Sequence, residues 1–323
     1  MGIPFLRLDR CKGINNIDSL IELPFNKYGD PDGSFLLSDG NNIDISNTQK
    51  ISRRDGSSTL VYSGNVNSMF SGLDTCLFMR SGTLHELKTD FTSTVLLSNL
   101  DPNSPMNYVE VADRIYFTNN SVIGYVSNST ATLLSIVAST FKRVMPPGHL
   151  IEYYHNRLYV VNGSVLYFSD AGALSQYDIR KNMRPFPSRI RMIQAVGDGI
   201  YVSDQDNIYF MDGPDPLEMS LVEKCNYPVI HGGFKKITGE NIGPGESSGT
   251  FIFMATSKGF CVGGNGGSFK NVTGEYYKID SLDEVTSSFR FKTGTSQFII
   301  LGKTTSNIGN LNIDIPEPVV IIH

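Results

Sequence analysis

The sequence repeats one short pattern five times, and this repetition restricts the fold more than any other feature. Each copy has a few strand-forming apolar or aromatic residues, then a turn of Gly, Asn, Asp or Ser, then a second apolar or aromatic cluster. Successive copies are 38, 43, 42 and 60 residues apart, counted from Leu77, Ile115, Leu158, Ile200 and Phe260. In the third copy the turn is Asn162-Gly163, which is typical of a type I′ hairpin because both residues accept a positive φ.

One further strand-like stretch precedes each hairpin, such as Tyr108–Val111 and Ile151–Tyr154. Each unit therefore has three antiparallel strands, with a weaker fourth in the connection, and a spacing of about 40 to 45 residues is typical of a four-stranded propeller blade. A hairpin cannot bury its apolar face alone, whereas stacked blades bury both faces. We predict an all-β protein, a β-propeller of about six to seven blades, with residues 1–323 as a single domain. Two packed β-sandwiches are the alternative.

Two segments interrupt the repeat. The longer step contains a Gly- and Pro-rich stretch, residues 228–249, which we predict to be a loop insertion on one rim. Residues 180–187 contain Arg184-Pro185-Phe186-Pro187, and because proline cannot donate to a ladder, this stretch is not expected to form a central strand.

Composition excludes several classes of protein. The chain has 27 basic and 32 acidic residues, a net charge of −5, which excludes a nucleic-acid binder driven by bulk positive charge. No apolar run approaches 18 residues, so no membrane span is expected. Residues 1–8 lack the pattern of a secretory leader, so secretion by the Sec route is not expected. The four cysteines are widely spaced without a CxxC pair, so we expect reduced thiols rather than a zinc site or a disulfide framework.

Motifs for catalysis or metal binding are weak. Gly245–Gly249 spells GxSxG, but it precedes a strand rather than a helix, so no nucleophile elbow is expected. His149 and His155 bracket a strand without a carboxylate partner, and Asp204–Asn207 is typical of an Asx turn rather than a calcium loop. Gly263–Gly267 lacks the Lys-Ser/Thr of a phosphate loop and is expected to be a turn with positive φ. We predict no enzyme activity, no catalytic residue, no metal and no cofactor.

Basic residues are the remaining candidates for contacts. The pairs Arg53-Arg54 and Lys142-Arg143 are interpreted as solvated blade edges that discourage edge pairing. A looser cluster has two interpretations: another solvated edge, or a site that meets acidic partner surfaces or phosphate. As possible partner or DNA-channel contacts we name Arg180, Lys181, Arg184, Arg189 and Arg191.

Several phrases occur together, in order, over residues 13–270. They are Gly13–Asn16, Asn42–Ser46, Ile51–Gly56, Asn107–Val111, Arg114–Asn119, Pro147–Leu150, Tyr153–Tyr159, Leu166–Ser169, Phe186–Ile190, Met254–Thr256 and Gly259–Phe269. In their order and extent they resemble a family of virion proteins of short-tailed bacteriophages, the β-propeller proteins that build the tail nozzle or hub below the head-to-tail adaptor. The chain departs from that family in lacking a third basic residue and an aromatic after Arg53-Arg54, and in having no Trp.

The resemblance implies a structural subunit of the virion tail, assembled in the host cytoplasm. It implies a ring of six copies that extends the conduit for DNA ejection. The implied partners are other copies of the chain, the head-to-tail adaptor or a portal-proximal protein, a tail fibre or distal tail protein, and genomic DNA in transit. The alternative function is a carbohydrate-binding propeller for host attachment, in which Tyr116, Tyr159 and Tyr201 would be recurring sugar-stacking rings; the other interpretation of these tyrosines is core.

Overall fold

The computed structural model describes residues 11–17, 35–37, 43–45, 50–53, 66–72, 75–137, 139–239, 249–274, 277–279, 284–292, 295–302 and 320–322. Within these ranges the regular structure is β, with no α-helix. The chain divides into two compact units, a central unit of residues 58–223 and a terminal unit of residues 1–57 and 224–323. Each unit is described by itself.

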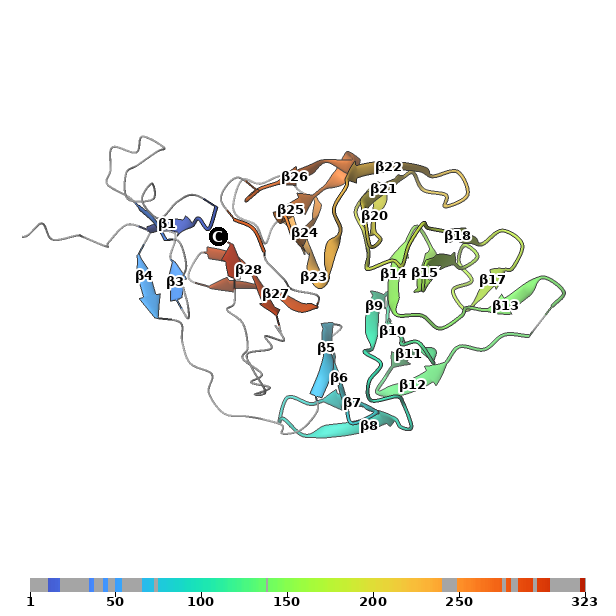
Figure 1. Cartoon of the computed structure of the whole chain (residues 1–323). Coiled ribbons are helices and arrows are strands. Elements are labelled where there is room, and N and C mark those ends of the chain that lie inside the picture. The colour runs from blue at the N-terminus through green and yellow to red at the C-terminus, as the bar shows by residue number, and fades with distance from the viewer. Residues whose placement is uncertain are drawn as a thin grey trace, which may run out of the picture. The chain divides into compact units, whose positions relative to one another are not determined.

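The central unit consists of successive four-stranded antiparallel sheets, each made from consecutive stretches of chain (Figure 1). The first blade is β5 (Val66–Gly72), β6 (Thr75–Arg80), β7 (Thr83–Leu87) and β8 (Ser93–Leu97), and the second is β9 (Asn107–Val111), β10 (Arg114–Thr118), β11 (Ile123–Ser127) and β12 (Thr130–Leu133). The third blade is β14 (Leu150–Tyr154), β15 (Arg157–Asn162), β16 (Val165–Phe168) and β18 (Met183–Pro185), and the fourth is β19 (Met192–Ala195), β20 (Gly199–Ser203), β21 (Ile208–Asp212) and β22 (Ser220–Cys225).

The second strand of each blade is buried on both faces, as β10 shows. Ile115 and Phe117 of β10 belong to a core that includes Leu77 and Leu84 of the first blade. Tyr116, which points to the opposite face because side chains alternate along a strand, packs in another core with Leu158 of the third blade. First strands are also neighbours, since β9 contacts both β5 and β14, and β14 contacts β19. Blades stacked face to face through their middle strands are the arrangement of a β-propeller.

Hydrogen bonds at the inner ends of the blades supplement this apolar packing. The hydroxyl of Thr118, the last residue of β10, donates to the carbonyl of Gly148 at 3.1 Å and accepts from the Gly148 amide at 3.0 Å, just before β14. The Asn107 side-chain amide of the second blade donates to the His149 carbonyl at 2.6 Å. The His149 ring lies 2.8 Å from the carbonyl oxygen of Ile190, before the fourth blade. Each link satisfies backbone groups that would otherwise be buried without a partner.

The terminal unit has one four-stranded sheet and one three-stranded sheet. The first is β23 (Val229–Thr238), β24 (Thr250–Thr256), β25 (Gly259–Gly263) and β26 (Phe269–Asn271), and the second is β27 (Val285–Lys292), β28 (Thr295–Gly302) and β29 (Val320–Ile322). Their shared core includes Ile230, Phe260, Val285 and Phe298. Two strand pairs complete the unit: β1 (Cys11–Ile14) with β2 (Phe35–Leu37), parallel, and β3 (Ile43–Ile45) with β4 (Ile51–Arg53), antiparallel.

The prediction of an all-β propeller is confirmed, and the six sheets of three or four strands in the described residues agree with the expected blade number. The prediction of one domain over 1–323 stays a prediction. The predicted rim loop over 228–249 is wrong in its first half, because β23 occupies residues 229–238. The glycines that suggested a loop form a bulge inside this strand, where Gly232 has φ 78° and a Cβ would lie 1.9 Å from the Val285 carbonyl oxygen. Residues 240–248 lie outside the described part.

Turn predictions were right about place and partly wrong about type. The predicted hairpin at Asn162-Gly163 exists, but Asn162 pairs with Val165, so the two central residues are Gly163 and Ser164. Gly163 has φ 62° and Ser164 does not have a positive φ, which indicates a type II′ turn with Gly at its first central position. Gly266 and Gly267 have φ 66° and 64°, as predicted for the glycine-rich turn. The proline-containing stretch supplies β18, the outer strand of its blade, as expected.

Candidate interaction surface

The third blade carries an additional two-stranded sheet that does not belong to the repeat. Between β16 and β18 the chain leaves the blade and forms β17 (Gln176–Asp178), which pairs antiparallel with β13 (Lys142–Val144). Figure 1 draws β13 and β17 side by side beyond β18. We call residues 139–144 and 170–182 together the arm.

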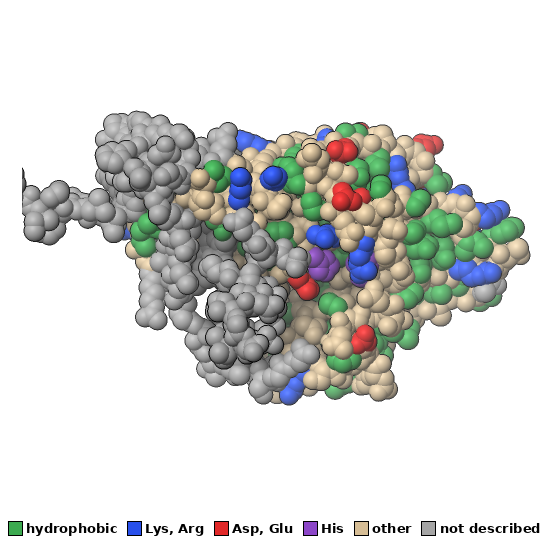
Figure 2. Space-filling model, viewed as in Figure 1, with side chains coloured by type: hydrophobic (Ala, Val, Ile, Leu, Met, Phe, Trp, Pro, Cys, Tyr) green, Lys and Arg blue, Asp and Glu red, His purple; other side chains and the backbone are tan. Residues whose placement is uncertain are grey.

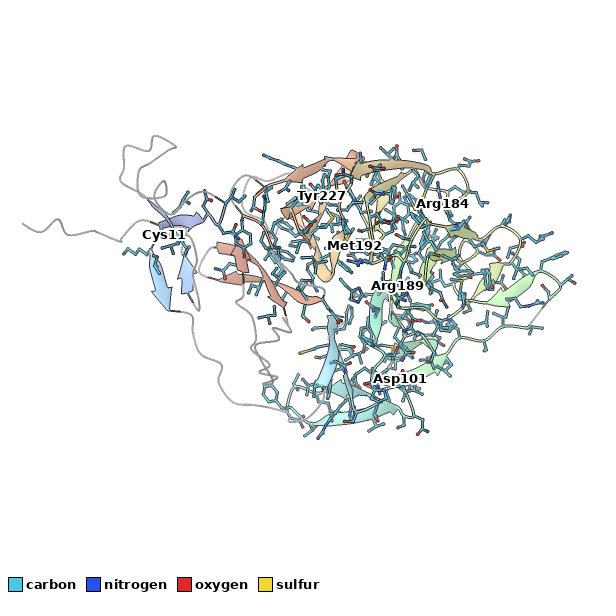
Figure 3. The ribbon with its side chains drawn as sticks, in the orientation of Figure 1. Cys11, Asp101, Arg184, Arg189, Met192 and Tyr227 are labelled. Carbon is cyan, nitrogen blue, oxygen red and sulfur yellow. The ribbon has the colours of Figure 1, made fainter. Side chains whose placement is uncertain are left out.

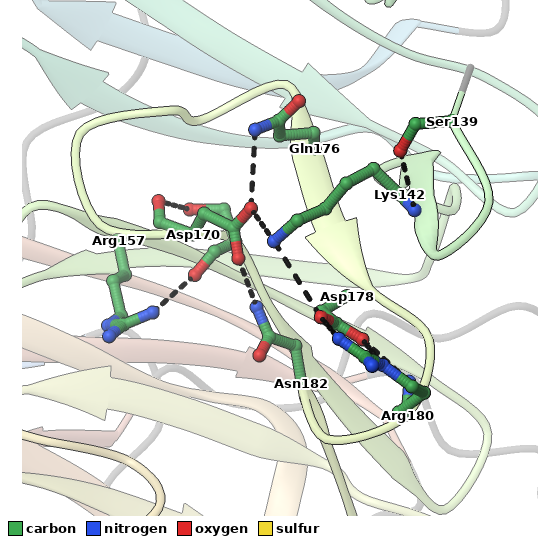
Figure 4. Close-up of polar contacts among 9 residues, drawn as sticks. Ser139, Lys142, Arg157, Asp170, Gln176, Asp178, Arg180 and Asn182 are labelled. Atoms are coloured by element: carbon green, nitrogen blue, oxygen red, sulfur yellow. Dashed lines mark hydrogen bonds and ion pairs between the residues drawn. The ribbon is translucent and has the colours of Figure 1, made fainter.

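A polar network at the centre of the arm holds its two strands together (Figure 4). One carboxylate oxygen of Asp170 accepts from the Gln176 side-chain amide at 3.2 Å and forms a short ion pair with Lys142. The other oxygen accepts from the Asn182 side-chain amide at 2.9 Å. Asp170 therefore joins both strands of the arm to the segment that enters β18.

A second carboxylate, Asp178, is buried and fixes the tip of β17. Its two oxygens accept from Nε and Nη2 of Arg180 at 3.0 and 2.7 Å, and the Arg180 backbone amide donates to it at 3.0 Å. The guanidinium also lies over the Phe141 ring, 3.9 Å from its centroid. These bonds to Arg180 hold the pKa of Asp178 well below its usual range. A bidentate pair stacked on an aromatic ring is rigid, so the arm has a defined conformation.

The Asp178–Arg180 pair predicts acid sensitivity of the arm. Because the pKa of Asp178 is lowered on folding, its contribution to stability is complete above the unfolded-state value of about 4 and is lost as the pH falls through and below that value. We expect the unfolding free energy of the wild type to fall more steeply between about pH 5 and pH 3 than that of Asp178→Asn. Denaturant titrations at each pH measure both slopes, and equal slopes would contradict the role given to this carboxylate.

The arm and the segment that precedes it, residues 133–137, expose several apolar side chains to solvent. Val137 is 95% exposed, Phe141 43% and Val144 38%, and Leu133 and Met183 beside them are exposed too. Figure 2 shows apolar side chains gathered where Figure 1 places β13, β17 and β18, with Lys and Arg at the border. Exposed apolar side chains that gather beside charged ones make this region the candidate interaction surface.

A pocket of about 470 Å³ opens at the base of the arm. Its walls include Ile136, Leu174 and Gln176 from the arm side and Arg114 and Tyr116 from the second blade. The Arg114 guanidinium lies over the Tyr125 ring at 4.5 Å from the centroid. Asp113, whose carboxylate lies 3.9 Å from Nε of Arg114, also lines the pocket, so its walls combine apolar side chains with one charge of each sign.

The structure distributes the five predicted contact residues over three places. Arg180 and Lys181 are exposed on the arm, whereas Arg184 of β18 is half-buried, donates to the Met219 carbonyl at 3.1 Å, and has its pKa lowered by desolvation. Arg189 and Arg191 precede β19, and Figure 3 shows Arg189 apart from Arg184. A contact with DNA or a partner stays a prediction for all five.

Sequence reasoning missed the apolar part of this surface. It interpreted Lys142-Arg143 as a solvated edge, yet the pair lies between Phe141 and Val144, which are both exposed. The apolar residues on both sides of the basic pair were the available signal. Lys142 is instead half-buried and paired with Asp170. In the first pair, Arg53 ends β4, and Arg54 lies outside the described residues.

The recurring tyrosines belong to the core. Tyr116 is 4% exposed, and Tyr159 and Tyr201 are fully buried, so none of the three rings is open to stack on a sugar. The carbohydrate-binding alternative stays a prediction, without these rings as its basis.

The other candidate motifs lie in turns and at strand ends, or outside the described residues. The Asp204 carboxylate accepts from the amides of Asp206 and Asn207 at 2.9 and 2.8 Å, which confirms the Asx turn. His149 is buried and His155 is exposed with its ring against Tyr154, and Gly245–Ser248 lies outside the described part. Cys11, Cys76, Cys225 and Cys261 form no disulfide with one another, and burial raises the pKa of Cys261 to about 12. Across the described ranges, no three His, Cys, Asp or Glu side chains gather as metal ligands would, and no helix is long and apolar enough to cross a membrane.

Comparisons with known proteins give structural likeness only. No protein-family model matches the chain, and no curated protein matches its sequence. A streptogramin B lyase is 14% identical with a TM-score of 0.47, over 79% of this chain and 82% of that one. BBS1N, solved in complex with ARL6DN, is 11% identical with a TM-score of 0.47, over 71% and 72%. XC5397 from Xanthomonas campestris, a gluconolactonase, is 12% identical with a TM-score of 0.44, over 73% and 82%. The fold assignment therefore rests on the sheets of this chain.

Proposed function

We propose that the protein is a structural subunit of a bacteriophage virion that assembles with copies of itself into a ring in the short tail. The arm is the observation that supports this proposal most strongly, because it exposes Phe141 and Val144, with exposed Val137 just before it, and exposed apolar side chains on an ordered element favour a protein contact. A contact between different surfaces of identical subunits closes into a ring when the rotation between copies permits.

The charge balance is compatible with a conduit for DNA. With a net charge of −5, the subunit has no general attraction for phosphate, and DNA is expected to slide past rather than bind. The proposed neighbours are the head-to-tail adaptor or another portal-proximal protein on one side and a tail fibre or distal tail protein on the other. The resemblance of residues 13–270 to tail nozzle and hub proteins is what suggests these partners.

Native mass spectrometry and negative-stain images of the purified full chain test the assembly. We expect a closed oligomer with one preferred copy number, six being the number the resemblance implies. A glycan array tests the alternative on the same preparation. A protein that remains monomeric at all accessible concentrations and binds a glycan would replace the ring by the carbohydrate-binding function.

A further inference from the structure

The outer edge of the fourth blade exposes acidic side chains, whereas the arm exposes basic ones. Strand β22 exposes Leu221, Val222 and Glu223, and the turn before it exposes Leu217 and Glu218. We call these five residues the acidic edge. It carries two carboxylates and no cation among its members, beside three large apolar side chains.

The turn before β22 is held in one conformation by Asp215. Its carboxylate accepts from the Leu217 amide at 3.1 Å, and its carbonyl accepts from the amides of Glu218 and Met219, both at 2.9 Å. Leu217 is 50% exposed on this fixed turn. The turn therefore presents an exposed apolar side chain, Leu217, next to an exposed carboxylate, Glu218.

The arm offers the complementary cations. Arg143 and Lys181 are exposed, and neither forms an ion pair with any residue that the structure describes. Arg143 donates only to backbone carbonyls, at 2.6 Å to Ser139 and 3.0 Å to Lys142. Each surface thus combines exposed apolar residues with charges of one sign, and the two signs are opposite.

Among the described residues of one copy, both surfaces remain exposed. Phe141 and Val144 of the arm and Leu221 and Val222 of the acidic edge are each 38–43% exposed. The arm is fixed to the third blade by Asp170 and Asp178, and β22 is hydrogen-bonded into the fourth blade. Since both are anchored in their own blades, the complementary partner of each must come from another molecule.

We propose that the arm of one copy docks on the acidic edge of the next copy, with the Leu217–Glu218 turn at the pocket beneath the arm. This docking rests on the proposed ring, and it would be the interface between neighbouring copies in that ring. The contact is heterologous, so repetition leads from copy to copy around a closed ring. The apolar residues supply the buried area, and the charges select the orientation and exclude arm-to-arm pairing.

Charge reversal tests this pairing. One variant carries Arg143→Glu and Lys181→Glu on the arm, and another carries Glu218→Lys and Glu223→Lys on the acidic edge. All four side chains are exposed and lie outside the Asp170 and Asp178 network, so circular dichroism should show wild-type folding. We expect each variant alone to raise the apparent dissociation constant of the oligomer by about tenfold or more, measured by analytical ultracentrifugation at low salt. Lys258→Glu with Lys270→Glu, two exposed cations of the terminal unit, is the matched control and should assemble as the wild type does.

The mixture of the two variants distinguishes pairing from general damage. In an equimolar mixture every reversed arm can meet a reversed edge, and every native arm a native edge, so we expect alternating rings with an even copy number by native mass spectrometry. If the wild type forms rings and both variants do so equally well, the docking is wrong and the proposed function remains. Loss of assembly without recovery in the mixture also overturns it, because the two surfaces then meet other partners. A wild type that is monomeric up to its solubility limit overturns the ring itself.

Discussion

Gly148→Ala should destabilise the protein by about 3 kcal/mol or more, because the added methyl group meets backbone atoms that cannot rotate away. A Cβ at this position would lie 2.1 Å from the Val161 carbonyl oxygen and 2.7 Å from a Val160 methyl carbon. The turn must move to relieve this steric clash, and that movement would break the two hydrogen bonds between Gly148 and Thr118. The seam between the second and third blades would then lose its polar link as well as its close packing.

Denaturant unfolding of the full chain measures this effect, with Gly163→Ala as the control. Gly163 has φ 62° but no atom within 4 Å of an added Cβ, so it reports the cost of the backbone conformation alone, about 1 kcal/mol. A Gly148→Ala protein as stable as the Gly163→Ala control would show that the turn has room and that the seam does not depend on close approach.

Tyr159→Ala should cost about 3–5 kcal/mol, whereas Tyr159→Phe should be neutral or slightly stabilising. The Tyr159 ring is fully buried in the third blade and lies 6.1 Å from the Phe168 ring, centroid to centroid. Its hydroxyl is buried and has no hydrogen-bond partner among the described residues, and burial raises the pKa of the phenol. Phenylalanine keeps the ring packing and removes an unpaired polar group, while alanine leaves a cavity.

Thermal and denaturant unfolding of the two variants separate these contributions. The comparison also tests the position of the recurring tyrosines, because an exposed sugar-stacking ring would lose little stability on truncation. A loss of more than about 1 kcal/mol in Tyr159→Phe would contradict the unpaired hydroxyl and indicate a bonded one.

The repeat made the blades predictable, because hairpin spacing and alternation are local properties of the sequence. Copies starting at Ile115 and Ile200 coincide with β10 and β20, the buried second strands. The errors arose where tertiary packing overrides local preference. Gly232-Gly233 suggests a loop in isolation, yet a bulge there lets β23 approach Val285 closely.

The candidate site was less accessible to sequence reasoning than the fold. Arg180 was identified as a basic residue, but its pairing with Asp178 and its stacking on Phe141 depend on β17 returning to β13. That pairing joins residues more than thirty positions apart and leaves no periodic signal. Exposure of Val137 and Phe141 likewise cannot be read from residue type, since the same types fill the core.

In the third blade β18 pairs directly with β16, although the chain forms β17 outside the blade between these two strands. The sheet therefore places no demand on the length or composition of the excursion between its last two strands. A substitution, insertion or deletion in the excursion would therefore change the surface that the third blade displays while leaving the pairing of β16 with β18 in place.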